Sequence, residues 1–171
     1  IFLFFLLSML LMVFLFWEIS TIFSLIGGIP FVSSTSKVIR AGLKLADLKS
    51  DEVFYELGSG IGTGILIASN EFKARAVGIE ISPFHYVISR FRTRKNPNIK
   101  IIRSNFKKIN ISEADIVYCY LSPSLMEDFE IQFKKQLKPG TRVVSLCFSL
   151  PNIKPQKTEL INGKKLFLYR F

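Results

Sequence analysis

The fold of this chain is set by residues 53–64, which read Val53-Phe54-Tyr55-Glu56-Leu57-Gly58-Ser59-Gly60-Ile61-Gly62-Thr63-Gly64. The first five residues are mostly apolar and include β-branched and aromatic side chains, which predicts a buried strand. Glycines then alternate with other residues, which is typical of a tight loop whose backbone a ligand can approach closely. The apolar residues that follow predict a helix that continues to about Phe72. A strand, a glycine-rich loop and a helix in this order indicate the first unit of an α/β fold.

The rest of the chain repeats this alternation. Further strands are predicted at residues 75–80, 99–103, 116–120 and 143–147, and helices at residues 83–94 and 124–137. Asn162-Gly163 separates two apolar runs at residues 158–161 and 165–169, and this pair is the strongest two-residue hairpin signal. The sequence therefore predicts a Rossmann-like, doubly wound, mostly parallel α/β sheet that ends in an antiparallel hairpin.

Residues 1–27 have a different composition from the rest of the chain. Residues 1–17 carry no charge, and Glu18 is the only charged residue before Lys37. A helix needs about 20 apolar residues to span a bilayer, so we expect residues 1–27 to form one transmembrane anchor. Glu18 would then lie near the headgroups beside Trp17. A cleavable signal peptide is the alternative, but the apolar run is longer than its usual core and no small-x-small cleavage site is evident.

The anchor is followed by a break and a short linker. Gly27-Gly28-Ile29-Pro30 should end the first helix, and residues 28–36 form the expected linker, in which Thr35 or Ser36 can cap the next helix. Residues 37–171 form the expected globular domain. Three basic residues follow the anchor closely, which predicts that the domain lies on the cytoplasmic side of the membrane: Lys37, Arg40 and Lys44.

The domain at residues 37–171 is strongly basic. It carries all 23 Lys and Arg residues and 12 of the 13 acidic residues, a net charge of +11. Such an excess is found on nucleic-acid-binding domains, on solvated surfaces, and beside anionic lipid, where each basic residue adds about 1 kcal/mol. Cys119 and Cys147 lie in apolar runs and are predicted to be buried free thiols. Neither cysteine has the spacing of a metal site, so no metal ligand is predicted.

The glycine-rich loop does not match the phosphate-binding patterns. A nicotinamide fingerprint would need glycine at position 63 or 65, and a Walker loop would need a lysine. Glu56 at the strand end would repel a phosphate but would favour an ammonium group. Glu80 ends the next strand, 20 residues after Gly60, where a dinucleotide fold places the carboxylate that binds ribose hydroxyls. S-adenosylmethionine, which carries an ammonium group and a ribose, fits both carboxylates.

The order Glu-x-Gly-x-Gly-x-Gly, followed by a strand-terminal Glu, resembles the class I S-adenosylmethionine-dependent methyltransferases. The family often has Asp where this chain has Asn105, so the polar side chain is kept but its charge is lost. The resemblance implies S-adenosyl-L-methionine as the cofactor. It also implies a set of cofactor-binding residues: Glu56, Gly58, Ser59, Gly60, Gly62, Glu80, Ile81, Asn105 and Phe106.

A narrower resemblance covers most of residues 29–153. The stretches at residues 30–32, 57–60, 120–126 and 142–145 are similar to the membrane-associated protein-lysine methyltransferases, related to the enzymes that modify the adenine nucleotide translocase and the c-subunit of ATP synthase. The chain departs from them at Gly60-Ile61-Gly62-Thr63, where that family usually has Gly-Asp-Gly-Arg. The resemblance implies that the partner is a membrane protein with an accessible lysine.

The substrate should meet the methyl group at the end of the fourth predicted strand. Tyr120 and Ser122 are the candidate catalytic residues there, and Phe31 and Tyr118 are the candidate residues that line the substrate slot. Tyr118 is more typical of a residue that packs in the core, and His85 is more typical of an ordinary half-buried histidine than of a base. A neutral lysine amine would attack in line, so alignment carries most of the catalysis and an apolar slot that lowers the lysine pKa would help.

Other functions compete with lysine methylation. Enzymes that methylate exocyclic base nitrogens usually carry Asn/Asp-Pro-Pro-Tyr after the fourth strand, whereas this chain reads Tyr120-Leu121-Ser122-Pro123. That difference, together with the membrane anchor, disfavours a nucleic-acid substrate. A lipid or quinone methyltransferase and a non-catalytic, cofactor-binding membrane scaffold remain alternatives.

Overall fold

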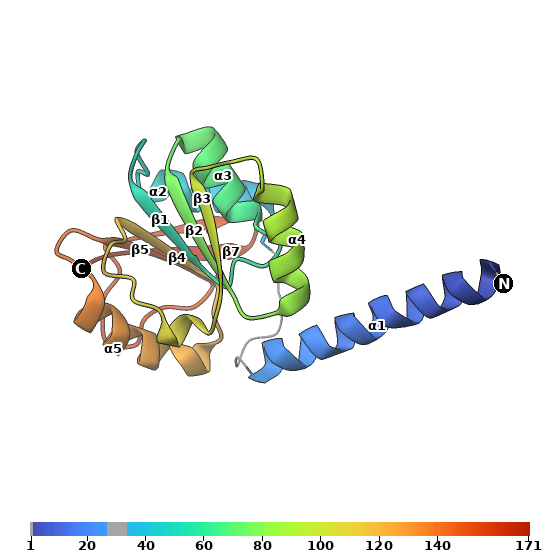
Figure 1. Cartoon of the computed structure of the whole chain (residues 1–171). Helices are drawn as coiled ribbons and strands as arrows, with labels where there is room; N and C mark the ends of the chain where they lie inside the picture. Colours follow the sequence, from blue (N-terminus) through green and yellow to red (C-terminus); the bar gives the residue numbers. More distant parts are fainter. Residues whose placement is uncertain (1, 27–33) are drawn as a thin grey trace.

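The computed structural model describes residues 2–26 and 34–171 and shows a seven-stranded sheet flanked by helices (Figure 1). The strands are β1 (Val53–Leu57), β2 (Arg75–Glu80), β3 (Ile99–Arg103), β4 (Ile116–Cys119), β5 (Arg142–Leu146), β6 (Lys157–Ile161) and β7 (Lys164–Arg170). The α-helices are α1 (Phe2–Ile26), α2 (Ser36–Leu45), α3 (Thr63–Phe72), α4 (Pro83–Thr93) and α5 (Met126–Gln136). There are also two short 3-10 turns: η1 (Phe106–Lys108) follows β3, and η2 (Pro123–Leu125) precedes α5.

The strand order in the sheet is β3-β2-β1-β4-β5-β7-β6. Strands β1 to β5 pair in parallel, and β7 pairs antiparallel with both β5 and β6. The order reverses at β1, whose two neighbours are β2 and β4. In open α/β sheets, ligands bind beyond the carboxyl ends of the strands at such a switch point. The predicted fold class is therefore confirmed, and its topology directs attention to the loop after β1.

Helices cover both faces of the sheet. On one face α2, α3 and α4 pack over a core that includes Ile39, Leu43, Phe54 and Ile65, all fully buried. On the other face α5 packs its buried Phe129 and Phe133 side chains over Leu57 of β1 and Val143 of β5. Helix α2 approaches the sheet closely at Gly42, where an added Cβ would lie 2.8 Å from a ring carbon of Tyr118. Only a glycine permits that contact.

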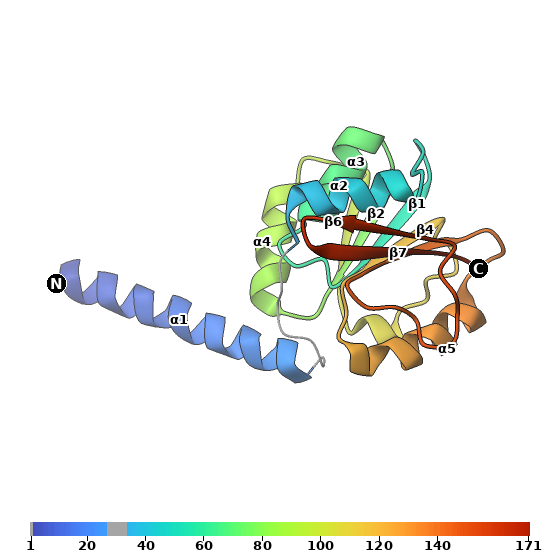
Figure 2. The same cartoon turned by 180° about the vertical axis from the view of Figure 1, so that it is seen from behind.

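The predicted hairpin closes the sheet (Figure 2). Asn162 and Gly163 have φ angles of 50° and 73°, which are the two positive values that a type I′ turn requires. The turn joins the ends of β6 and β7 and matches the twist of the two strands. The predicted turn is confirmed at both of its residues, and the flanking strands match to within one residue at each end.

Several predicted boundaries differ from the observed ones by a residue or two. The fourth strand ends at Cys119 instead of residue 120, and the fifth runs from Arg142 to Leu146. The fifth strand ends there because Cys147 adopts a left-handed φ of 69°, which breaks the extended backbone. Thr35 takes the cap position of α2, but its side chain makes no capping hydrogen bond.

Helix α1 has 25 residues and extends away from the sheet (Figure 1). Its segment Phe2–Ile19 has a mean hydropathy of 2.5 and is nowhere buried, so it is long and apolar enough to cross a membrane. Its later part contacts α4, because the Phe84 ring lies 5.3 Å from Trp17 and 5.9 Å from Phe16 between centroids. The predicted break at residues 27–30 and most of the linker at residues 28–36 lie outside the described residues.

Candidate cofactor and substrate site

The loop after β1 is held in shape by left-handed glycines and by the end of β2. Gly58, Gly60 and Gly62 have φ angles of 77°, 53° and 82°, a region in which side chains other than glycine are strained. The backbone N–H groups of Gly58 and Ser59 both donate to the carbonyl of Ile79, at 2.9 and 3.0 Å. The alternating glycines are therefore required by the turn itself, and the loop stands at the carboxyl edge of the sheet.

Glu56 is a buried carboxylate beneath this loop. Its side chain is 7 % exposed and accepts one hydrogen bond, from the backbone N–H of Ile65 at 3.1 Å. Gly64 leaves the space for it, since a Cβ there would lie 2.6 Å from the carboxylate carbon. Burial, with a smaller contribution from the nearby Glu80, raises the pKa of Glu56 to about 8. Among the described residues no Lys or Arg pairs with Glu56, so the site favours a cationic ligand.

Glu80 ties the loop to the start of α4. One of its carboxylate oxygens accepts from the backbone N–H of Gly60 at 2.7 Å, and the other accepts from that of Ser82 at 2.8 Å. Burial raises the pKa of Glu80, while these bonds and one from the N–H of Ile81 oppose the rise. The two predicted carboxylates are thus brought together at the end of neighbouring strands.

Ser59 presents a buried hydroxyl with no hydrogen-bond partner in the described part of the chain. It lies against β2 at Gly78, where an added Cβ would come within 2.7 Å of the hydroxyl oxygen. An unsatisfied buried hydroxyl is uncommon in native proteins and calls for a partner such as a ligand. Its position in the loop is the one predicted for a cofactor-binding residue.

Arg92 is a residue of the site that sequence reasoning missed. Its guanidinium donates to the carbonyl of Ile61 at 2.6 Å and to the hydroxyl of Thr63 at 3.4 Å. Helix α4 therefore holds the loop from outside, near its two final glycines. A lone arginine on a surface helix carries no sequence signal for such a contact, because the contact depends on how α3 and α4 pack.

Asn105 and Phe106 follow β3 at the same edge of the sheet. The side chain of Asn105 accepts a hydrogen bond from the backbone N–H of Lys107 at 2.9 Å and so caps η1. Phe106 is only 4 % exposed and packs on Phe129, with ring centroids 5.1 Å apart. Phe106 belongs to the core beneath α5, while Asn105 is half-buried at the edge. Their contact with a cofactor stays a prediction.

Tyr118 lies in the core, next to Glu56 on the neighbouring strand. It is 2 % exposed, and its hydroxyl makes no hydrogen bond of normal geometry within the described residues. Burial and the Glu56 carboxylate raise the pKa of the phenol, and the side chain of Ser34 is near enough to oppose that rise. Tyr118 therefore packs in the core beside Glu56, and its contact with a substrate stays a prediction.

Tyr120 and Ser122 follow β4 at the carboxyl edge. The Tyr120 ring is half-buried, stacks on Phe148 at 6.4 Å, and has the ammonium nitrogen of Lys164 4.8 Å from its centroid. The Ser122 hydroxyl lies 2.9 Å from that of Ser124. Phe148 and Lys164 were not predicted as site residues, because only the pairing of β5 with β7 brings them to Tyr120. Phe31 lies outside the described residues.

His85 is buried near the start of α4. Its backbone N–H donates to the capping hydroxyl of Ser82 at 3.3 Å, and burial lowers the pKa of its imidazole. Its ring lies 6.4 Å from that of Trp17. A buried position on α4, close to Trp17 of α1, is typical of a structural histidine.

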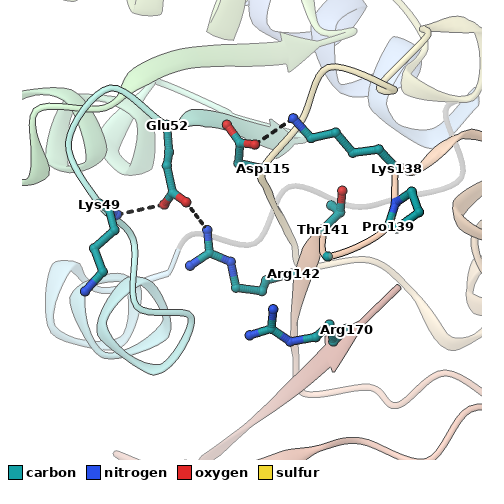
Figure 3. Close-up of a pocket in the computed structure, with 9 residues that line it drawn as sticks. Lys49, Glu52, Asp115, Lys138, Pro139, Thr141, Arg142 and Arg170 are labelled. Carbon is teal, nitrogen blue, oxygen red and sulfur yellow. Dashed lines mark hydrogen bonds and ion pairs between the residues drawn. The ribbon is translucent and has the colours of Figure 1, made fainter.

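A cavity of about 330 Å³ lies at the opposite, amino edge of the sheet (Figure 3). Arg142 pairs there with Glu52 and donates to the carbonyls of Ala46 and Asp47 at 2.7 and 2.9 Å. Asp115 pairs with Lys138 at 2.6 Å and accepts from the backbone N–H of Val53. These bonds hold together the segments that precede β1, β4 and β5. The edge is a structural polar network, far from the glycine-rich loop.

The reversal of strand order at β1, the left-handed glycine loop and the two buried carboxylates define a class I S-adenosylmethionine-dependent methyltransferase. Residues 56–157 match the family described as ANTKMT methyltransferase domain, and the chain belongs to this family. It is 34 % identical over 133 residues to a protein-lysine N-methyltransferase of Saccharolobus islandicus (strain REY15A), covering 75 % of this chain and 83 % of that protein.

Two further similarities extend this assignment. The adenine nucleotide translocase lysine N-methyltransferase of Mus musculus is 26 % identical over 130 residues, which cover 74 % of this chain and 56 % of that protein. The crystal structure of an RNA methyltransferase from Salinibacter ruber with S-adenosyl-L-homocysteine has a TM-score of 0.79 and 31 % identity, and covers 81 % of this chain and 93 % of that one. S-adenosylmethionine is therefore the cofactor, as predicted, and the chain is a methyltransferase.

Proposed function

We propose that this chain transfers a methyl group from S-adenosylmethionine to a lysine side chain of a membrane protein. The observation that carries the proposal is the 34 % identity to a protein-lysine N-methyltransferase over most of both chains. A relative named for the adenine nucleotide translocase supports a substrate in the membrane.

The residues of the loop suit the cofactor. Glu56 is a buried carboxylate that lacks a cationic partner in the described chain, so it would hold the ammonium group. Glu80 would accept from the ribose hydroxyls, and the unpartnered Ser59 hydroxyl would bond the ligand between them. When bound, S-adenosylmethionine supplies a methyl group activated by its positively charged sulfur. The chain holds that group in line with the incoming amine, and alignment carries most of the rate.

The aromatic pair at the carboxyl edge would receive the lysine. The Tyr120 ring already has one ammonium nitrogen 4.8 Å above it, that of Lys164, so a cation can approach its face. The Phe148 ring, which stacks on Tyr120, makes one wall of this lysine slot apolar. An apolar wall favours the neutral amine, which is the form that attacks. Ser122, at the start of η2, would border the same slot.

The proposal assigns three parts to the chain. Residues 1–27 anchor the chain in the membrane, residues 28–36 link the anchor to the domain, and residues 37–171 form the catalytic domain on the cytoplasmic side. The length and hydropathy of Phe2–Ile19 support the anchor, and the basic residues after it support the orientation: Lys37, Arg40 and Lys44. An anchor raises the effective concentration of acceptors at the bilayer.

RNA methylation is the second candidate, favoured by the Salinibacter ruber structure and by the basic domain. The chain lacks Asn/Asp-Pro-Pro-Tyr after β4, with which such enzymes usually hold a flipped base. That segment reads Tyr120-Leu121-Ser122-Pro123 and begins with the aromatic residue of the lysine slot. We therefore rank RNA below a lysine side chain.

The test uses the full chain, its own membrane fraction and S-adenosylmethionine with a labelled methyl group. Label should enter protein, and mass spectrometry should find methylated lysine. The control is the variant Gly60→Arg, whose side chain fills the loop at a left-handed position. Label in RNA or in the organic-solvent fraction would contradict the lysine proposal.

A further inference from the structure

Helix α4 presents an apolar stripe to solvent. Val87 and Phe91 are 54 % and 65 % exposed, and Phe84 precedes them by one helical turn. The spacing of three and four residues places these side chains on one side of the helix. The opposite side carries His85, Ser89 and Thr93, which are buried against the domain. A row of apolar side chains that extends from the half-buried Phe84 to the exposed Val87 and Phe91 is typical of an interaction site.

The stripe lies in the most basic part of the chain. Residues 81–112 include eight basic residues and no acidic one: Arg90, Arg92, Arg94, Lys95, Lys100, Arg103, Lys107 and Lys108. On α4 the guanidinium of Arg94 lies 3.8 Å from the centroid of the Phe91 ring, so the apolar and basic groups share one surface. A helix with an apolar stripe flanked by Lys and Arg is typical of helices that lie in the plane of a membrane interface.

The position of α1 indicates what covers this stripe. Phe16 and Trp17 of α1 both contact the ring of Phe84, at the first turn of α4. Figures 1 and 2 show α1 extending from the side of the domain on which α4 lies, with α4 running across the direction of α1. If α1 crosses a bilayer, Trp17 lies near its surface, where indole rings collect. Helix α4 then lies along that surface.

We propose that the outward face of α4 rests on the anionic surface of the bilayer that α1 crosses. The face consists of Phe84, Val87, Phe91, Arg90, Arg94 and Lys95. The inference rests on the proposed anchor and adds an orientation to it. The apolar side chains enter the interface, and the basic ones meet acidic headgroups. A bilayer fits better than RNA, because the centre of the face is aliphatic and aromatic and continues the apolar surface of α1.

This orientation has a consequence for the site. Glu80 bonds the backbone of both Gly60 in the loop and Ser82 at the cap of α4. The guanidinium of Arg92 also reaches the loop from α4. The loop is therefore fixed to the helix that rests on the membrane. Its open side would meet lysines close to the bilayer surface.

The test places an environment-sensitive fluorophore on single cysteines of the full chain, in a Cys147→Ser background with Cys119 buried. Labels at Val87→Cys and Phe91→Cys are compared with one at Ile131→Cys on α5, which is 62 % exposed and equally apolar. The chain is reconstituted in phosphatidylcholine vesicles with and without phosphatidylserine. Nitroxide lipids near the headgroups should quench the two α4 labels but leave the α5 label bright.

Two matched charge-reversal variants test the electrostatic part of the inference. Arg94→Glu should reduce the quenching at Val87→Cys in phosphatidylserine vesicles, whereas Lys135→Glu on α5 should not. About 1 M salt, at which the screening length is about 3 Å, should also reduce it.

The outcomes distinguish a failure of this inference from a failure of the proposed anchor. A label at Leu10→Cys reports insertion of α1 through quenching by nitroxides deep in the bilayer. If that label is quenched but the α4 labels are no more quenched than the one at Ile131, the α4 inference is wrong and the anchor stands. If the Leu10 label is not quenched, both are wrong. Shielding of the α4 labels by added RNA and not by vesicles would also overturn the inference.

Discussion

Replacement of Glu56 by glutamine removes a buried charge and keeps the shape of the side chain. The amide oxygen of Glu56→Gln can still accept from the backbone N–H of Ile65, which now lies at 3.1 Å from the carboxylate. In the folded chain, burial raises the pKa of Glu56 to about 8 from an ordinary value of 4.5. The wild-type chain must therefore keep a proton on this carboxyl, or bear the cost of a buried charge, whenever no cofactor is bound.

The sign of the pH effect follows from this shift. Because the folded pKa is the higher one, the contribution of Glu56 to stability is fully present below pH 4.5 and is lost as pH rises through 8. Between pH 5 and pH 8 the free energy of unfolding should fall by about 3–4 kcal/mol from this group, at about 1.4 kcal/mol per pH unit. The Gln variant should lack this fall. Without cofactor it should be more stable than wild type at pH 8.

Chemical denaturation of the full chain in detergent micelles at pH 5 and pH 8 measures the free energy of unfolding of the wild type and of Glu56→Gln. The control is Glu71→Gln, since Glu71 is exposed and its pKa is lowered by Arg40 instead of raised. Equal pH dependence of unfolding in wild type and Glu56→Gln would refute the reasoning.

Cofactor binding gives the same residue a second signature. Between pH 6 and 7 the cofactor amine is charged, and its ammonium group favours the ionised form of Glu56. Binding should therefore release close to one proton, and affinity should rise about tenfold per pH unit. Calorimetry in buffers of different ionisation enthalpy counts the proton. Glu56→Gln should bind weakly and release less, and an unchanged proton count in that variant would contradict the assignment.

Three further perturbations test the site and its frame. Gly64→Ala would normally stabilise a helix by about 1 kcal/mol, but here the new Cβ would lie 2.6 Å from the carboxylate carbon of Glu56; calorimetry should show cofactor affinity reduced about tenfold or more. Glu80→Ala should lose the acceptor for Gly60 and for the ribose, and should weaken cofactor binding by about 1.5–3 kcal/mol, measured in the same way. Arg142→Met should lower the free energy of unfolding by about 2–4 kcal/mol, because two backbone carbonyls and a carboxylate lose their donor. The exposed Arg170→Met at the same edge should change it by less than about 0.5 kcal/mol, and equal effects of the two would contradict the structural role of Arg142.

Local features of this protein were open to prediction from the sequence because they depend on a few consecutive residues. The glycines at 58, 60 and 62 predict a loop, and the structure places all three at positive φ. The Asn162-Gly163 turn, the strand at residues 75–80 and the carboxylates in the last two residues of β1 and β2 follow from the same local rules. The backbone sterics of glycine and the two-residue period of strands act within a turn or a strand. For this reason the loop after β1 could be predicted from the sequence alone, and the class of enzyme followed from the resemblance of its motif to a known family.

Contacts between distant segments required the folded chain. Tyr118 and Glu56 are 62 residues apart and become neighbours because β4 pairs with β1. Arg92 reaches the loop only because α4 packs beside α3. The apolar stripe of α4 has the period of a core-facing helix, and only the packing of the domain shows that Val87 and Phe91 face outward. Periodicity tells which side chains share a face, but the direction of that face depends on the rest of the chain and, for α4, on the position of α1.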